Sequence, residues 1–180
     1  MIAWLVAFMV SVSPPSLAVK FRGELDVDLV TSRYESLAKD VLSVTSDPNE
    51  KLSNPSKSAL RLIAQAFCES AFDWRVDSGK CVPGTCDHGQ AWSIWQLHAE
   101  DGLIFDGPRF TYARNRSESW KLDHFGEISK GGDLIRDRKL AARYALHMAR
   151  VSPQLWSTWK CASDSASLWV SRHPYQGSAQ

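Results

Sequence analysis

Residues 58–72 read SALRLIAQAFCESAF and are the most informative stretch of the chain. Apolar side chains recur here in steps of three, four and seven residues, the spacing of one buried face of an α-helix; they are Leu60, Ile63, Ala64, Phe67 and Ala71. Ser56 or Ser58 is placed to cap the start of such a helix. We therefore expect an amphipathic helix that ends near Glu69 and Ser70.

Glu69 lies about 180° from Leu60 on the helical wheel, opposite the apolar stripe. The ordinary interpretation of such a residue is a solvated carboxylate at a helix end, because most Glu side chains are exposed. Leu62 and Ala66, however, lie near Glu69 on the wheel. Apolar surroundings raise the pKa of a carboxyl group, and a Glu with a raised pKa can act as a general acid near neutral pH.

The rest of the chain also has mainly helical patterns. Residues 133–151 read DLIRDRKLAARYALHMARV and form the clearest helix, with Asp133 as its predicted N-cap and Pro153 beyond its end. Shorter helices are predicted over residues 34–45, 155–160 and 166–171, with a loop over 46–56. The aromatic segment 89–98 fits either a helix start or an extended segment, so we expect at most a small hairpin.

Length and charge exclude several classes of protein. The chain has 180 residues, of which 44% are hydrophobic and 23% charged, so we expect one compact domain rather than a disordered chain or a coiled coil. Its formal net charge is +1, which speaks against nucleic-acid binding and against a polybasic membrane anchor. The five His residues show no metal-binding spacing, and no nucleotide-binding motif is present, so we expect no metal ion and no cofactor.

The N-terminus predicts export. Residues 1–10 read MIAWLVAFMV, an apolar run shorter than the ~20 residues that span a bilayer, and Ser16-Leu17-Ala18 is a small-x-small cleavage site. We interpret residues 1–18 as a signal peptide and residues 19–55 as an N-terminal extension, and expect a periplasmic or extracellular protein without a stable membrane anchor. The alternative is a buried N-terminal helix, which Pro14 and Pro15 would end.

Four cysteines, Cys68, Cys81, Cys86 and Cys161, suggest two disulfides in an exported protein. Three pairings are open. Cys81 and Cys86 flank a turn-forming stretch that contains Pro83 and Gly84, which favours a local bridge and leaves Cys68 to pair with Cys161. A four-cysteine zinc site is the competing interpretation, but the spacing lacks two short Cys pairs.

Glu69 and Ser70, followed by residues 87–96 (DHGQAWSIWQ), resemble the lysozyme-like superfamily, in particular goose-type lysozymes and soluble lytic transglycosylases. In that superfamily a Glu-Ser pair ends a buried helix, and a later Asp-x-Gly-x-x-x-Gly-Leu-Met-Gln stretch forms a wall of the cleft. The positions that match this later stretch are Asp87, Gly89, Ile94 and Gln96. Three positions depart from it or from its continuation, with Ser93 for Gly, Trp95 for Met, and His98 for a further Asp of goose-type enzymes.

The resemblance implies a mainly helical α+β fold, a lysozyme-like single domain over residues 56–180 with a small hairpin or loop region. It implies that Glu69 protonates the glycosidic oxygen and that Ser70 and Gln96 support the substrate or the backbone of the cleft. Asp87 matches the residue that helps to place water in goose-type enzymes. The His98 departure weakens a hydrolytic mechanism, which needs a second carboxylate.

The resemblance also implies a lytic transglycosylase that cleaves peptidoglycan between N-acetylmuramic acid and N-acetylglucosamine and leaves 1,6-anhydromuramyl ends. The alternatives are a goose-type muramidase, a non-catalytic peptidoglycan-binding module, and a small secreted structural protein. The expected partner is the glycan strand of peptidoglycan, and a protein of the cell envelope or of a secretion machine is a further candidate.

Two aromatic residues, Tyr175 and Trp92, are the first candidates for substrate contacts. Pro174-Tyr175-Gln176-Gly177 is similar to an Ala-Tyr-Asn-Ala-Gly segment of many transglycosylases, whose Tyr points at the catalytic Glu, with Tyr144 as the rival for that role. Among the Trp residues near the proposed site, Trp92 is the first choice for a sugar contact, ahead of Trp74 and Trp95. Most Trp side chains fill cores, which is the ordinary interpretation for each of the three.

Overall fold

The computed structural model describes residues 1–78, 91–100, 103–104, 137–151 and 160–175. These residues are mainly helical, as the sequence predicts. The chain divides into two compact units: unit 1 comprises Met1–Ala71 and Lys160–Gln180, and unit 2 comprises Phe72–Trp159. The predicted boundary at residue 55 therefore falls inside unit 1, at the start of a helix.

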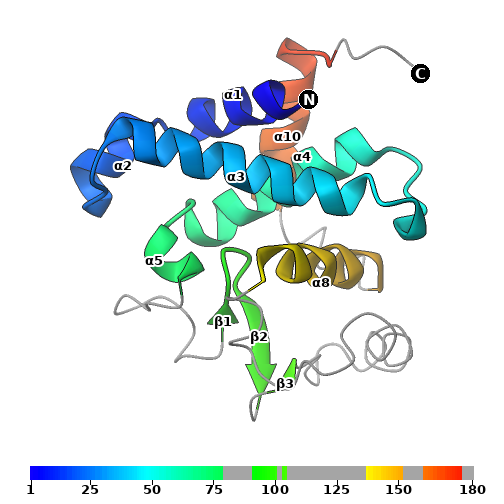
Figure 1. The fold of residues 1–180 in the computed structure, drawn as a ribbon. Helices are drawn as coiled ribbons and strands as arrows, with labels where there is room; N and C mark the ends of the chain where they lie inside the picture. Colours follow the sequence, from blue (N-terminus) through cyan, green and yellow to red (C-terminus); the bar gives the residue numbers. More distant parts are fainter. Residues whose placement is uncertain (79–90, 101–102, 105–136, 152–159, 176–180) are drawn as a thin grey trace. The chain divides into compact units, whose positions relative to one another are not determined.

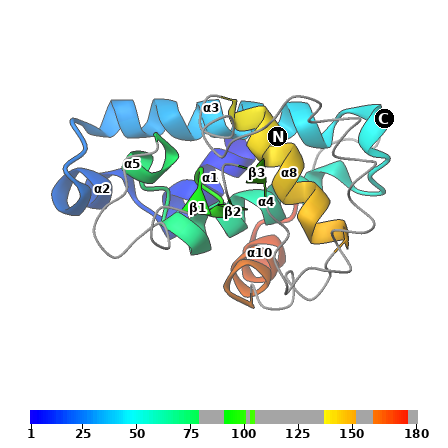
Figure 2. The same ribbon diagram turned by 90° about the horizontal axis from the view of Figure 1, so that it is seen from below.

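Unit 1 is a set of helices packed around a shared apolar core (Figure 1). Helix α4 packs against α3, α10 and α1, while α1 and α2 each pack against α3. Figures 1 and 2 both show α1 and α3 side by side. The described elements of this unit are α1 (Ile2–Val12), α2 (Pro15–Arg22), α3 (Val27–Thr45), the 3-10 turn η1 (Pro48–Glu50), α4 (Pro55–Ser70) and α10 (Lys160–Arg172).

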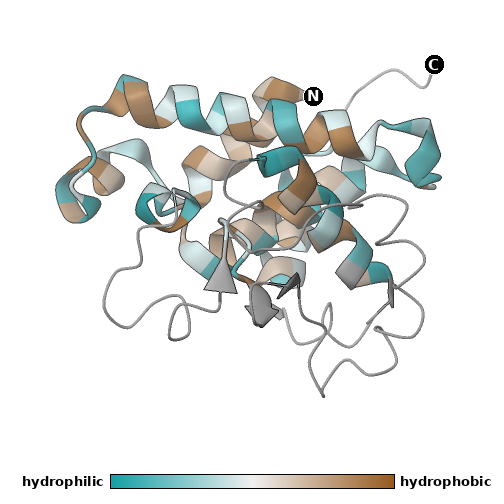
Figure 3. Cartoon of the chain, turned by 60° about the horizontal axis from the view of Figure 1, so that its bottom comes forward, coloured by the Kyte–Doolittle hydropathy of each residue, from teal (hydrophilic) through white to brown (hydrophobic). Residues whose placement is uncertain are grey.

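Apolar residues at helical spacing build this core. On α3 the fully buried side chains follow steps of three and four residues; they are Val30, Tyr34, Leu37, Ala38 and Val41. Figure 3 shows hydrophobic and hydrophilic patches alternating along the helices, as expected when one face of each is buried. The Tyr34 hydroxyl is buried with the ring and donates a hydrogen bond to the Ser13 carbonyl at 2.8 Å, so the core contains no isolated polar group there.

The helix starts differ from the sequence predictions because other residues cap them. Helix α3 begins at Val27 rather than residue 34, since the Asp26 carboxylate accepts a hydrogen bond from the Leu29 amide at 2.6 Å. For α4 the predicted caps, Ser56 and Ser58, are wrong: the Asn54 side chain accepts from the Lys57 amide at 2.9 Å. Pro at the first helical position then costs no hydrogen bond, because that amide would have no partner inside the helix.

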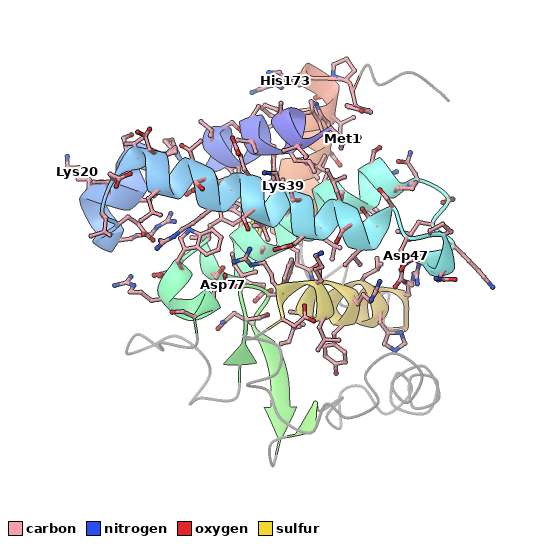
Figure 4. The ribbon with its side chains drawn as sticks, viewed as in Figure 1. Met1, Lys20, Lys39, Asp47, Asp77 and His173 are labelled. Atoms are coloured by element: carbon pink, nitrogen blue, oxygen red, sulfur yellow. A yellow bond between two sulfur atoms is a disulfide. The ribbon has the colours of Figure 1, made fainter. Side chains whose placement is uncertain are left out.

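The segment predicted to be a signal peptide forms α1 and the start of α2. Leu5, Phe8 and Met9 have no exposed surface, and α1 ends at Val12, before the two prolines. The Trp4 indole donates to the His173 carbonyl at 2.9 Å, and Figure 4 shows Met1 and His173 at neighbouring ends of α1 and α10. Removal of residues 1–18 remains a prediction.

None of the described helices is by itself long and apolar enough to cross a membrane. Within the described part of the chain, one pair of consecutive helices, α1 and α2, reaches that length and composition when taken together, with a bend of 47° between them.

Unit 2 contains a small antiparallel sheet and two described helices. They are α5 (Trp74–Asp77), β1 (Ala91–Trp92), β2 (Leu97–Glu100), β3 (Leu103–Ile104) and α8 (Arg138–Val151). Trp92 pairs with Leu97 and Ala99 with Ile104, so the strand order is β1-β2-β3. The described part of the ambiguous segment 89–98 thus forms a small hairpin, with paired strands joined by a turn over residues 93–96, rather than a helix.

Helix α8 follows the predicted pattern, with Ala141 and Ala145 fully buried. The Asp137 carboxylate accepts from the Leu140 amide at 3.1 Å; Asp133, the predicted cap, lies outside the described residues. Arg138 joins α8 to α5 because its guanidinium pairs with Asp77 at 2.9 Å and lies over the Trp74 ring at 5.0 Å.

Candidate functional site

Glu69 lies one residue before the end of α4, and its side chain is half-buried. Burial raises the pKa of the Glu69 carboxyl above its ordinary value, and desolvation is the one cause of the shift. The direction agrees with the expectation from its apolar neighbours on the helical wheel. A carboxyl group in this state holds its proton to higher pH than an exposed Glu, which is the property a general acid needs.

The backbone directly after Glu69 is strained. Ala71 and Phe72 have φ values of 52° and 60°, a left-handed conformation that favours glycine. The Ala71 amide donates to the Phe67 carbonyl at 2.6 Å, and the Arg22 guanidinium donates to the Ala71 carbonyl. Arg22 also donates to the Ser13 hydroxyl at 3.0 Å. These bonds hold the chain in its sharp exit from α4, and strained backbone of this kind is frequent at active sites.

Ser70 and Gln96 both make hydrogen bonds to nearby backbone. The Ser70 hydroxyl donates to the Ala66 carbonyl at 2.8 Å, and the Gln96 amide donates to the Ser93 carbonyl at 3.2 Å. The resemblance allowed either a substrate role or a backbone role for these residues. Their hydrogen bonds favour the backbone role.

The turn between β1 and β2 has the conformation that a glycine would adopt. Ser93 has φ 64° and Gln96 has φ 50°, while Ile94 and Trp95 between them are fully buried. Ser93 stands at the position where the similar enzymes have Gly. Its hydroxyl accepts a long hydrogen bond from the Trp95 amide at 3.3 Å, which offsets part of the strain.

A disulfide joins Cys68 of α4 to Cys161 of α10 across 93 residues of sequence. It ties the start of α10 to the end of α4 that carries Glu69. This is one of the two predicted bridges; Cys81 and Cys86 lie outside the described residues, so the other bridge stays a prediction.

Tyr175 lies at the opposite end of α4 from Glu69. It is 40% exposed, its ring is 5.5 Å from that of Trp4, and it lines a groove of about 950 Å³. The α4 residues that line this groove fall between Asn54 and Arg61, all in the first half of the helix. Because a 16-residue helix is about 24 Å long, the structure does not bring Tyr175 and Glu69 together.

The remaining predicted residues are placed as follows. Trp95 is fully buried and Trp74 is 8% exposed, so both belong to the core of unit 2 rather than to an open subsite. The main chain of Trp92 pairs with Leu97 in the sheet, but its side chain lies outside what the structure describes. Asp87 also lies outside the described residues, so its role as a second carboxylate stays a prediction.

One residue of interest was missed by the sequence analysis. Gln65 of α4 has no exposed surface, and neither its amide nitrogen nor its amide oxygen has a hydrogen-bond partner among the described residues. Most buried polar groups are hydrogen-bonded, so this one requires an explanation. The sequence signal was available: Gln65 interrupts an otherwise apolar stretch and precedes Glu69 by four residues, one helical turn.

Among the residues that the structure describes, no group of three or more His, Cys, Asp or Glu side chains is arranged to hold a metal ion. No protein-family model, curated protein or solved structure matches the chain.

Proposed function

We propose that the chain is a peptidoglycan lytic transglycosylase in which Glu69 is the catalytic acid and then the base. The observation that carries the proposal is the half-buried Glu69 at the strained end of α4, with its pKa raised by burial. The Glu-Ser pair supplies the resemblance to transglycosylases, and the raised pKa supplies the chemistry. An α+β fold of the lysozyme-like type is part of this proposal.

The reaction needs one carboxyl group that gives and then takes a proton. Protonated Glu69 donates to the glycosidic oxygen, and the bond between that oxygen and C1 of N-acetylmuramic acid breaks. The Glu69 carboxylate then takes the proton of the muramyl C6 hydroxyl, whose oxygen bonds to C1. The products are a 1,6-anhydromuramyl end and a free N-acetylglucosamine 4-hydroxyl, so no water is consumed.

Further observations support the proposal. The φ of Ser93 is positive at the position where the similar enzymes have Gly, so the backbone has the conformation that their sequence favours. Gln96 braces the same turn through the Ser93 carbonyl. The proposal also includes export of the protein. Its substrate is then the cell wall, and its protein partner belongs to the cell envelope.

The test is a digest of purified peptidoglycan with the purified chain, read by mass spectrometry. We expect fragments lighter by one water than reducing muropeptides. Glu69→Gln should reduce their yield by at least about 100-fold, the usual size of a general acid–base contribution. The matched control is Glu35→Gln, which removes an exposed carboxylate from α3 and should leave the yield unchanged.

The other outcomes point to other functions. Reducing ends in place of anhydro ends would identify a muramidase, with Asp87 as the candidate second carboxylate. Glycan binding without products, unchanged by Glu69→Gln, would identify a binding module. If the folded chain neither binds the glycan nor releases products, the proposal is refuted.

A further inference from the structure

Gln65 is an uncompensated polar group in the middle of α4. Its side chain is fully buried, yet both polar atoms of the amide lack hydrogen-bond partners among the described residues. A buried amide in this state destabilises the fold relative to an apolar side chain of the same shape. A stability cost of this kind is common at functional sites, where selection acts on activity.

Gln65 and Glu69 share one face of the helix. Residues four apart on an α-helix have Cβ atoms about 5–6 Å apart, and their side chains are direct neighbours. Both residues lie on continuous helix, since α4 runs from Pro55 to Ser70. Rotation of the two side chains is therefore the movement that would bring the Gln65 amide nitrogen to the Glu69 carboxyl.

We infer that Gln65 is a positioning residue for Glu69: once the two side chains rotate into contact, the Gln65 amide N–H donates to one carboxyl oxygen and thereby directs the other oxygen towards the glycosidic bond. This inference rests on the proposed function of Glu69. In the acid form of Glu69 the bond fixes the rotation of the carboxyl group. After proton donation it becomes a hydrogen bond to a carboxylate, which is shorter and stronger.

Among the described residues, no charged group contributes to the pKa shift of Glu69. Helix α1 carries no charged side chain. The other helices packed against α4 are α3 and α10. Their charged residues are Asp28, Arg33, Glu35, Lys39 and Asp40 on α3, and Lys160, Asp164 and Arg172 on α10. His173 follows α10. Arg22 of α2 donates to the Ala71 carbonyl. Burial is nevertheless the only cause of the raised Glu69 pKa, so an amide donor would be its first specific partner.

The decisive variant is Gln65→Met, which keeps the side-chain length and removes the amide. We expect the melting temperature not to fall, because the amide has no partner in the described conformation. We also expect kcat on peptidoglycan to fall by about 10-fold or more through misorientation of the acid, with little change in KM. The basic limb of the pH–rate profile should move to higher pH, because the carboxylate loses a donor.

Thr45→Val is the matched control. The Thr45 hydroxyl is also buried without a partner in the described part of the chain, but it lies on α3. Its loss should leave kcat and the pH profile unchanged. A Gln65→Met protein with wild-type kcat and pH profile would overturn the inference.

A second readout separates this inference from the proposed function. Titration of Glu69 by carbon NMR, in the wild type and in Gln65→Met, needs no catalysis. A higher pKa of Glu69 in the variant supports the contact even if the chain proves inactive on peptidoglycan. An unchanged Glu69 titration would refute the contact whatever the activity.

Discussion

At the scale of single residues, Glu69 combines two properties that oppose each other. It lies at the end of α4 where a carboxylate could be solvated, yet its half-buried position disfavours the charged form. A raised pKa in the folded state means that the folded chain binds the proton more tightly than the unfolded chain. The same burial that favours the proposed role of Glu69 as an acid therefore weakens the fold once the group ionises.

We expect the stability of the chain to depend on pH through Glu69. Its contribution to stability is fully present below the unfolded-state pKa, close to the ordinary Glu pKa of 4.5, and is lost as pH rises through the higher folded-state pKa. Glu69→Gln should remove this loss and make the variant more stable than wild type at neutral pH. Thermal melts from pH 3 to 8 check the expectation.

Glu35→Gln serves as the control in these melts, because it removes one exposed carboxylate from the same unit. Parallel wild-type and Glu69→Gln curves over the whole range would contradict the expectation.

At the scale of elements, helix boundaries and turns depend on a few local bonds. The periodicity of residues 58–72 predicted α4, but Asn54 and Pro55 decide where it begins. The segment 89–98 was ambiguous because its apolar run is short, and strand pairing of Trp92 with Leu97 shows that its described part is a hairpin. Such pairing depends on the turn between the two strands, and a short apolar run does not by itself distinguish a strand from a helix.

The turn after β1 gives a prediction about Ser93. Its φ of 64° strains any residue with a Cβ atom, by about 1–2 kcal/mol in the left-handed region. Ser93→Gly removes this strain but also the bond from the Trp95 amide, whereas Ser93→Ala removes the bond and keeps the strain. We expect Ser93→Gly to exceed Ser93→Ala in unfolding free energy by about 1 kcal/mol.

Urea denaturation of the two variants measures this difference, because both changes remove the same hydroxyl group. Equal stabilities would mean that Ser93 does not hold a left-handed conformation in solution.

At the scale of the whole molecule, the N-terminal segment is part of the packing of unit 1. Leu5, Phe8 and Met9 are fully buried, and α1 packs against α3 and α4. Burying each large apolar side chain contributes roughly 1.5–3 kcal/mol relative to exposure. A chain that has lost residues 1–18 by cleavage would lack these contributions.

We therefore expect the full chain to be more stable than residues 19–180 by several kcal/mol, as measured by guanidinium denaturation. In the full chain, Leu5→Ala should cost about 2–5 kcal/mol. Leu17→Ala, at a residue that is 46% exposed, should cost much less. If residues 19–180 match the full chain in stability, the burial of α1 adds nothing to stability.

Sequence by itself determined the mainly helical class, the position of the helix that carries Glu69, and the direction of its pKa shift. Each of these follows from local spacing and from the chemistry of neighbours on one helix. The sequence also favoured the Cys68–Cys161 pair, but only because Cys81 and Cys86 flank a turn and were expected to pair with each other. That bridge closes over 93 residues, and a contact of that range depends on how α10 returns to α4.

Only the tertiary structure decided the burial of Gln65, the positive φ of Ser93 and the separation of Tyr175 from Glu69 along α4. The first and the last arise where segments distant in sequence meet, and the positive φ of Ser93 arises where two short strands pair across a tight turn. The Tyr175 motif was similar to that of transglycosylases in residue type, but α10 places it beside Trp4 and the first half of α4. Residue pattern specifies what a side chain can do, whereas packing decides which other groups it can reach.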